Sequence, residues 1–262
     1  MTEFQKRVVQ GLSSLLLGAV SSSVAHAGDA GSSRSWQGFH GGIALGAAHG
    51  KASPDSTVSL GSPNYVQPVN IPRVTDALRR SIDGNSFSGS GLAGYDIQRG
   101  NLVFGIEADL TLMDFSETTR TRTDYSGLGD SFQVENRLET KFSFSIRPKI
   151  GYSFGDTMVH AGIGPVIGRF KYSSRYEDTT ANNPDDFFSR TRTAWGVSLN
   201  VGVNHAIGND WYLRGDYVFN HFPNAVDGNS AITATGAPHN SGVKHDSDFD
   251  FHTVRVGLMK RF

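Results

Sequence analysis

The sequence contains no cysteine, which excludes disulfide bonds and thiolate metal sites. It also lacks a basic surplus, because 24 lysines and arginines face 25 aspartates and glutamates. Nucleic acid is therefore not expected as a partner. After the N-terminal region, no segment approaches the ~20 apolar residues of a membrane-spanning helix. If the body of the chain crosses a membrane, it must do so with strands.

The first residues have the pattern of an export signal. Lys6 and Arg7 precede the apolar stretch VVQGLSSLLLGAVSSSVAHA, which closes with a small-x-small triplet. A basic region, an apolar region and a cleavage site in this order are typical of a secretory signal peptide. The alternative, an N-terminal membrane anchor, is disfavoured by the serines within the stretch. We expect residues 1–27 to be the signal peptide, 28–35 a short linker and 36–262 the folded domain.

From Trp36 onward, the chain repeats segments in which apolar residues alternate with polar or small ones. Leu102, Phe104 and Ile106, for example, alternate with Val103, Gly105 and Glu107. A side-chain period of two predicts a strand with one apolar and one polar face. The segments with this pattern are 36–49, 87–98, 102–115, 141–154, 158–170, 193–207, 211–222 and 253–262.

The connections between these segments alternate in length. Three are tight turns around QRGN, FGDT and GNDW, and the others are long stretches rich in Gly, Pro, Asn, Asp and Ser. Short turns at one end and long loops at the other are typical of transmembrane barrels. The sequence predicts an all-β fold, an eight-stranded antiparallel up-and-down transmembrane β-barrel. It would have short periplasmic turns, four long extracellular loops and both termini in the periplasm.

Charged residues in mid-strand decide between this fold and a soluble lipocalin-type barrel, whose apolar faces would point inward. In a membrane barrel the charges face the lumen, where each ion must be paired because its desolvation is costly. These inward charges are Glu107, Asp109, Arg147, Lys149, Arg214, Asp216 and Arg255. The pairs expected from strand heights are Glu107 with Lys149, Asp109 with Arg147, and Asp216 with Arg255. They form either a structural plug or the wall of a polar conduit.

Aromatic residues gather at two heights along the strands. Two belts flanking an aliphatic band are typical of the two interfaces of a membrane. The belt residues are predicted to be Trp36, Tyr95, Tyr152, Trp211 and Phe262 at the short-turn end, and Phe87, Phe115, Phe142, Trp195 and Phe219 near the long loops.

Nearly all of the chain after the signal resembles a known family. The segments AGYDIQRGNLVFGIEADL, RPKIGYSFGDTMVHAGIG, WGVSLNVGVNHAIGNDWYLRGDYVF and VRVGLMKRF carry the resemblance. They are similar to small outer-membrane β-barrels of Gram-negative, especially alphaproteobacterial, cells: the porin-family or surface-antigen proteins, related in fold to the OmpA membrane domain and the opacity proteins. The resemblance implies a location in the outer membrane.

The last strand resembles the C-terminal signal that the barrel assembly machinery recognises. Phe262 would be its terminal aromatic and interface anchor, preceded by the outward residues Val256 and Leu258. Lys260 departs from the pattern, which usually has an apolar or aromatic residue there. We expect its side chain to extend to the headgroups.

Three other groups of residues are weighed as sites. The last loop holds His239, His245, Asp246, Asp248, Asp250 and His252, which could bind a divalent cation or haem, although their spacing is irregular. Arg120, Arg122, Arg190 and Arg192 near the outer rim could contact lipopolysaccharide phosphates or be ordinary loop charges. His49 is the one loose candidate for a catalytic base, and its surroundings match no lipid-enzyme motif. We expect no enzyme, no cofactor and no metal.

The sequence therefore predicts a structural and surface-interaction role: envelope integrity, lipopolysaccharide contact and surface recognition. A porin-like passive channel for small solutes is the alternative, and a lipid-modifying enzyme or a haem- or metal-binding surface protein is more distant. Expected partners are outer-membrane lipid and lipopolysaccharide, the assembly machinery during biogenesis, and a host or surface ligand at the loops.

Overall fold

A computed structural model describes residues 34–127, 129–179, 185–233 and 240–262. The chain divides into two compact units, Met1–Arg34 and Ser35–Phe262. The expected signal peptide 1–27 and residues 28–33 of the expected linker lie outside the described residues. Among the described helices, none is both long and apolar enough to cross a lipid bilayer.

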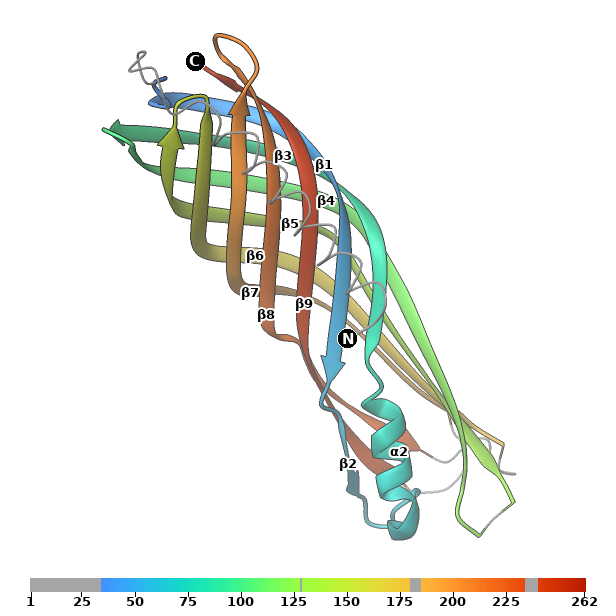
Figure 1. Cartoon of the computed structure of the whole chain (residues 1–262). Coiled ribbons are helices and arrows are strands. Elements are labelled where there is room, and N and C mark those ends of the chain that lie inside the picture. Colours follow the sequence, from blue (N-terminus) through green and yellow to red (C-terminus); the bar gives the residue numbers. More distant parts are fainter. Residues whose placement is uncertain (1–33, 128, 180–184, 234–239) are drawn as a thin grey trace. The chain divides into compact units, whose positions relative to one another are not determined.

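The second unit is a closed antiparallel barrel of eight long strands (Figure 1). Each strand pairs with its neighbour in sequence, and β1 closes the ring by pairing with β9. The barrel strands are β1 Gly38–Pro54, β3 Ile82–Arg99, β4 Leu102–Asp124, β5 Ser131–Phe154, β6 Thr157–Asp178, β7 Asp185–Ala206, β8 Trp211–Thr233 and β9 Asn240–Arg261. The predicted fold class is confirmed.

Three tight turns and both ends of the barrel domain lie at one end, which we call the short-turn end. Two of the turns contain only two residues, Gly100–Asn101 and Gly155–Asp156. Gly100 and Gly155 have positive φ values of 61° and 68°, a conformation that tight hairpin turns demand and glycine supplies without strain. At the same end, His40 near the start of β1 pairs with Arg261 at the end of β9.

The other end differs from the expected set of long loops, because most of each linker is strand. After a register shift between Leu112 and Phe115, the strands β4 and β5 remain paired out to Asp124 and Ser131, leaving only a short connection between them. We call this part of the strands, beyond the last outward apolar residues, the extension. The sequence signal was available, since Phe132, Val134 and Leu138 alternate with polar residues and are buried.

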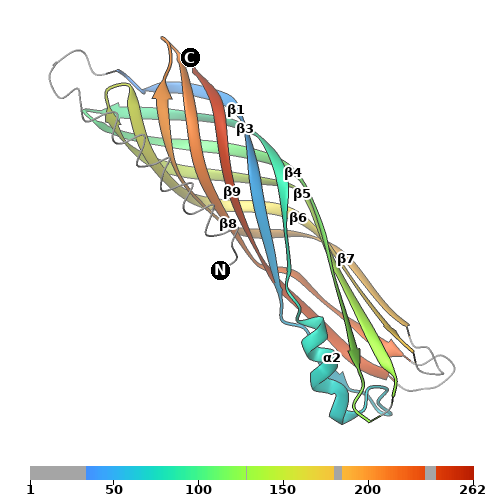
Figure 2. The same cartoon turned by 45° about the vertical axis from the view of Figure 1, so that its right-hand side comes forward.

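The connection between β1 and β3 carries further secondary structure that the periodicity did not predict. It contains β2 Thr57–Leu60, which pairs with β9, the 3-10 turn η2 Pro68–Asn70 and the helix α2 Ile71–Leu78. Proline stands in the first turn of α2, where its missing N–H costs nothing. Val74, Ala77 and Leu78, spaced three and four residues apart, are the buried face of α2. Figure 2 shows α2 at the extended end.

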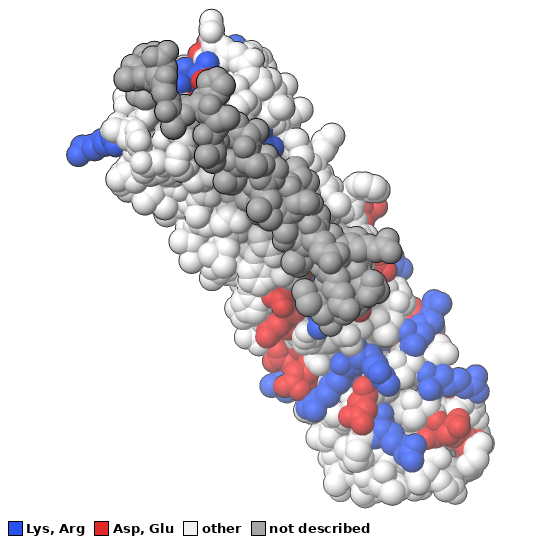
Figure 3. Space-filling view, viewed as in Figure 1, with Lys and Arg blue, Asp and Glu red and all other residues white. Residues whose placement is uncertain are grey.

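The outer surface of the barrel changes character along its length. On the short-turn half, every strand presents exposed apolar residues, here called the apolar band, such as Ile43, Ile106, Ile150, Leu199 and Leu258. In Figure 3 the Lys, Arg, Asp and Glu side chains gather on the extension, while the half above it is largely free of them on the face shown. A wall that is apolar outside for this length is suited to lipid rather than water.

Candidate functional site

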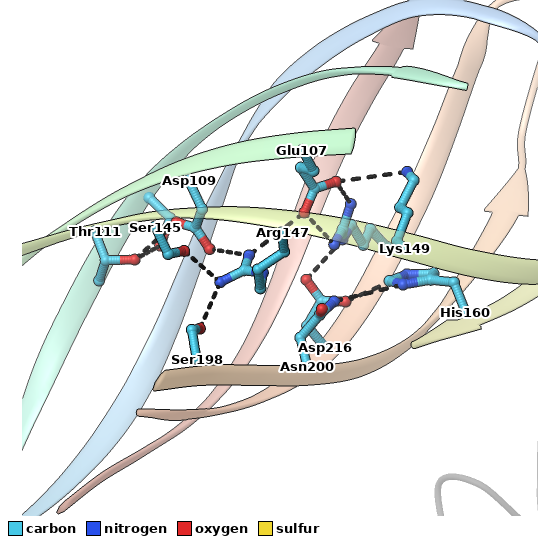
Figure 4. A network of polar contacts seen from close by, with 12 residues as sticks. Glu107, Asp109, Thr111, Ser145, Arg147, Lys149, His160, Ser198, Asn200 and Asp216 are labelled. Atoms are coloured by element: carbon cyan, nitrogen blue, oxygen red, sulfur yellow. Dashed lines mark hydrogen bonds and ion pairs between the residues drawn. The ribbon is translucent and has the colours of Figure 1, made fainter. Parts of the chain in front are cut away.

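The seven charges predicted to face the lumen all lie in the barrel interior, at the height of the apolar band. Each of these side chains is buried, with exposed fractions of 6% or less for the whole residue. They come from β4, β5, β8 and β9, so the ring brings together residues from opposite sides of the barrel (Figure 4). We call this group and its direct partners the charge network.

Glu107 is the centre of one half of the charge network. Its Oε2 and Oε1 accept hydrogen bonds from Arg214 Nη1 and Nη2 at 2.5 and 2.9 Å. Lys149 Nζ lies 3.6 Å from Oε2, and Arg147 Nη2 lies 3.4 Å from Oε1. The bidentate contact with Arg214 is a strong, orienting type of ion pair.

Asp109 and Asp216 form the other half of the charge network. Asp109 Oδ2 lies 2.6 Å from Arg147 and 2.7 Å from Arg255. Asp216 Oδ2 accepts from Arg214 Nε at 2.6 Å and lies 3.1 Å from Arg255 Nη2. The three carboxylates Glu107, Asp109 and Asp216 are thereby joined into one connected system by three shared arginines, Arg147, Arg214 and Arg255.

The sequence reasoning missed three titratable members of the charge network. Asp96 pairs with Lys149 Nζ at 3.0 Å, His40 lies 3.5 Å from both Asp96 and Glu107, and His160 lies 3.5 Å from Asp216. Their inward parity on β1, β3 and β6 was the signal that could have found them. With Asp96 included, four carboxylates face four cations, so the network is neutral when its histidines are neutral.

All three expected ion pairs are present, but the strongest contact is a different one. Glu107 is closer to Arg214 than to Lys149. Strand height predicts partners on adjacent strands, whereas β4 and β8 meet only across the lumen. Sequence alone gives no register for that contact.

Apolar layers close the interior on both sides of the charge network. Toward the short turns lie Trp36, Ala44, Leu92, Val103, Met158, Tyr212 and Met259. Toward the extension lies an aromatic layer, in which Phe249 has ring centroids 5.5 Å from Phe115, 5.2 Å from Phe170 and 5.7 Å from Phe251. A void among these rings measures about 10 Å³, no more than the volume needed for one water molecule.

A third apolar cluster, which we call the cap, fills the extension. Val74, Ala77 and Leu78 of α2 pack there with residues of β5, β6, β8 and β9 and with Tyr125, which directly follows β4. Asp178 accepts hydrogen bonds from Tyr65 at 2.5 Å and Tyr125 at 2.9 Å, and Tyr125 also bonds to Tyr176. Burial, with the nearby Asp178 carboxylate, raises the pKa of Tyr125 above its ordinary value. The phenol therefore stays protonated and able to donate.

Most predicted belt residues face outward. Tyr95, Tyr152, Trp211 and Trp195 are exposed, while Phe142 and Phe219 are partly exposed. Phe87 and Phe262 are exposed as well, and Phe39 and Phe154 are further exposed aromatics at the short-turn end.

The belt prediction was wrong for Trp36 and Phe115. Trp36 is 4% exposed and donates through Nε1 to Ser153 Oγ at 2.9 Å, and Phe115 is 1% exposed within the aromatic layer. Both residues share the parity of the inward row of their strands. Height along the strand was considered and parity was not.

The residues of the proposed metal or haem loop are dispersed. His245 points inward, where its ring stacks on Phe188 with centroids 4.3 Å apart, and burial lowers its pKa to about 4. His252 is partly buried beside Tyr217, 2.6 Å from its hydroxyl, and Asp250 pairs with His221 at 2.7 Å. His239 lies outside the described residues. In the described part of the chain, no group of three such side chains is arranged to hold a metal ion.

The four candidate arginines for lipopolysaccharide lie on the extension with partners of their own. Arg120 pairs with Glu135 at 2.6 Å, Arg192 pairs with Asp227 at 2.6 Å, and Arg190 lies 3.8 Å from Asp227. Arg122 donates to Ser131. Arg120 is eight residues beyond Leu112, about 27 Å of strand at ~3.4 Å per residue. It therefore lies on the extension, well outside the apolar band.

His49 and the terminal strand complete the predicted sites. His49 Nδ1 lies 3.0 Å from Asn85 Oδ1 on the neighbouring strand. Val256, Leu258 and Phe262 are exposed on the outer wall. The Lys260 ammonium lies over the rings of Trp211 and Phe262, 5.6 and 5.4 Å from their centroids.

Sequence comparisons match this architecture. A family model described as an outer membrane protein beta-barrel domain matches residues 12–262. The "31 kDa outer-membrane immunogenic protein" of Brucella melitensis biotype 1 is 28% identical over 187 residues, covering 69% of this chain and 68% of the relative. The "22 kDa outer membrane protein" of Rhizobium leguminosarum bv. viciae is 26% identical over 137 residues, covering 52% of this chain and 53% of the relative.

Two solved structures have a partly similar course of the chain. Neisserial surface protein A is 16% identical, with a TM-score of 0.32 over 86% of this chain and 97% of that one. Ail of Yersinia pestis, in complex with the heparin analogue sucrose octasulfate, is 9% identical, with a TM-score of 0.34 over 85% of this chain and 99% of that one.

Proposed function

Because this chain belongs to the outer membrane protein β-barrel domain family, a family of the Gram-negative outer membrane, we propose that it is a non-conducting anchor. In this proposal the membrane-embedded half holds the protein in the bilayer. The extension has three roles in this proposal: envelope integrity, contact with lipopolysaccharide and recognition at the cell surface.

The observation that carries the proposal is the filled interior. Along the barrel axis, an apolar layer, the charge network, the aromatic layer and the cap follow one another. A passive channel needs a continuous water path, whereas these layers are built of packed apolar side chains and of ion-paired charges. The charge network suits a structural role, because desolvated ions are tolerated only when they are well paired.

The extension supports the surface part of the proposal. Its strands reach beyond the apolar band with polar outer faces, and α2 covers a core of its own. The name of the Brucella relative describes an outer-membrane immunogenic protein, which fits a chain whose extension faces the medium. We assign no reaction to the chain, and the relatives named above are not named as enzymes.

Biogenesis adds two parts to the proposal. Residues 1–27 would direct export, and the outward row Val256, Leu258 and Phe262 would be read by the barrel assembly machinery. The outward orientation of that row supports the second part, since an assembly partner must reach these side chains.

Recordings in planar bilayers test the proposal. The refolded wild type should insert, show the gel shift of a folded barrel and leave the conductance at background. Removing a charge partner, as in Arg214→Met, should raise conductance only if it loosens the packing. Steady conductance of the wild type, with ion selectivity shifted by Glu107→Gln, would instead establish the porin-like channel.

A further inference from the structure

A pocket on the outer wall lies at the boundary between the apolar band and the extension. It has a volume of about 420 Å³ and is formed by β5, β6 and β7. Its lining residues are Glu139, Thr140, Lys141, Phe142, Arg169, Lys171 and Thr191. We call it the cationic pocket.

A β-bulge builds the cationic pocket. The pairing of β5 with β6 shifts between Thr140 and Ser143. On the extension side of the shift, Leu138 and Thr140 point inward. On the short-turn side, Ser143 and Ser145 point inward, so the inward parity of β5 changes from even to odd residue numbers. Lys141 and Phe142 consequently both reach the outer wall, one exposed and one partly exposed. Bulges commonly redirect a side chain in this way.

The cationic pocket has a net positive charge with two cations uncommitted. Its three cations face one carboxylate, Glu139, giving +2. Glu139 lies 2.8 Å from Arg137 and 3.7 Å from Lys171. Among the described residues, Lys141 and Arg169 form no ion pair. Asp114, exposed on β4, does not line the pocket.

The height of the cationic pocket matches lipid headgroups. Arg169 follows the band residue Ile167 by two positions on β6, and it pairs with Thr193, two positions before Trp195 on β7. Phe142 supplies an apolar floor beside the lysine and arginine. A ligand here would place its acyl chains on the apolar band and an anionic group among the cations.

We propose that the cationic pocket binds a phosphate group of the lipopolysaccharide headgroup in the outer leaflet. Arg169 provides a planar, weakly hydrated fork that matches phosphate oxygens, and Lys141 and Lys171 add compact point charges that donate charge-assisted hydrogen bonds. The proposal rests on the lipopolysaccharide contact within the proposed function. It is independent of whether the lumen conducts.

Native mass spectrometry of the refolded barrel tests the assignment. The probes are bis-phosphorylated lipid A, the same lipid A after phosphatase treatment, and inorganic phosphate. The variant is Lys141→Gln, Arg169→Gln and Lys171→Gln together. Its control is Arg80→Gln, Arg175→Gln and Lys244→Gln, which removes the same charge from exposed sites on the extension.

We expect the wild type to bind phosphorylated lipid A at least about tenfold more tightly than the pocket variant does, since charge-assisted hydrogen bonds to phosphate are lost. The control variant should stay within about twofold of the wild type. Dephosphorylated lipid A should bind both proteins alike. All proteins should keep the same urea midpoint in zwitterionic detergent, because the replaced side chains are exposed.

The outcomes separate the site from the broader proposal. If the pocket variant keeps the wild-type preference for phosphorylated lipid A, the site is wrong while the lipopolysaccharide contact stands. If the wild type itself has no preference, both the site and that contact are overturned. Competition by inorganic phosphate at concentrations as low as those of lipid A would assign the pocket to a free anion and overturn the lipid assignment.

Discussion

The two halves of the barrel are built from the same strands with opposite polarity. In the embedded half, Leu199 and its neighbours face outward while Glu107 and Arg214 are buried inside. In the extension, Phe132 and Val134 are buried inside and charged side chains such as Arg120 are outside. The surrounding solvent accounts for the inversion, because lipid admits only an apolar outer face whereas water favours a polar one.

The comparison also shows that burial, not proximity, gives an ion pair its importance. The Arg120–Glu135 pair on the extension and the Arg147–Asp109 pair in the lumen have the same 2.6 Å separation. The first is open to water and contributes little, while the side chains of the second are 1% and 2% exposed. Equivalent substitutions in the two halves should therefore change the free energy of unfolding by unequal amounts.

The largest effect is expected from removing one charge of the network. Glu107→Gln leaves Arg214 and Lys149 short of a carboxylate and should lower the free energy of unfolding by about 3–5 kcal/mol. The same change on the extension, Glu135→Gln, should cost less than about 1 kcal/mol. Urea unfolding of the refolded proteins in lipid vesicles measures both.

A double-mutant cycle adds the partner test. Combining Glu107→Gln with Arg214→Met should cost less than the sum of the single changes, and the coupling should exceed that with Lys149→Met, since Arg214 makes the closer contact. Additive, small effects in the lumen would show that the charges stand in water.

The second prediction inverts the outer face on one strand. Leu199→Arg places a charge in the centre of the apolar band on β7 and should destabilise the barrel by about 2–4 kcal/mol. Ser189→Arg, on the outward row of the same strand but in the extension, should change stability by no more than about 0.5 kcal/mol. Equal costs at the two positions would place the membrane boundary elsewhere.

The sequence predicted the embedded half far better than the extension. Period-two alternation around a charged inward row identified the strands and all seven charges from residues such as Glu107 and Arg147. In the extension the same alternation carries fewer apolar residues among many polar ones, so strand was taken for loop. The bulge at Lys141 and Phe142, which breaks parity, has no signal in the sequence.

Two further failures have different causes. The contact of Glu107 with Arg214 crosses the lumen between strands that are not neighbours, so no local pattern encodes it. Trp36 and Phe115 were placed by height although their parity pointed inward, which is a failure of the interpretation and not of the sequence.

The third prediction uses pH to weaken the extension. His245 has a pKa of about 4 in the folded protein because of burial, below the ~6.5 of an unfolded chain. Its contribution to stability is complete above pH 6.5 and is lost as the pH falls toward 4, by at most about 3 kcal/mol. Hydrogen exchange of β8 and β9 in the extension should report this loss.

A matched variant isolates that histidine from other titrating groups. His245→Gln does not titrate and keeps a hydrogen-bonding group for Ser230, whose Oγ lies 2.9 Å from His245 Nε2. In the variant, the protection factors of these amides, which are corrected for the intrinsic pH dependence of exchange, should no longer differ between pH 7 and pH 4.5. An unchanged pH dependence would mean that His245 is not responsible.

The smallest effect is expected where one hydrogen bond holds the cap. Tyr65→Phe keeps the ring against the cap cluster but removes the hydroxyl that donates to Asp178 at 2.5 Å. Asp178 still accepts from Tyr125, so the carboxylate is not left without a donor. The loss should be about 1 kcal/mol, the usual net value of one such bond. It should also be local: amides of α2 should exchange faster while those of β4 and β5 around Glu107 stay protected.

If the embedded strands were to exchange faster as well, the two halves would unfold as one cooperative unit. The contrast between them would then be one of composition alone.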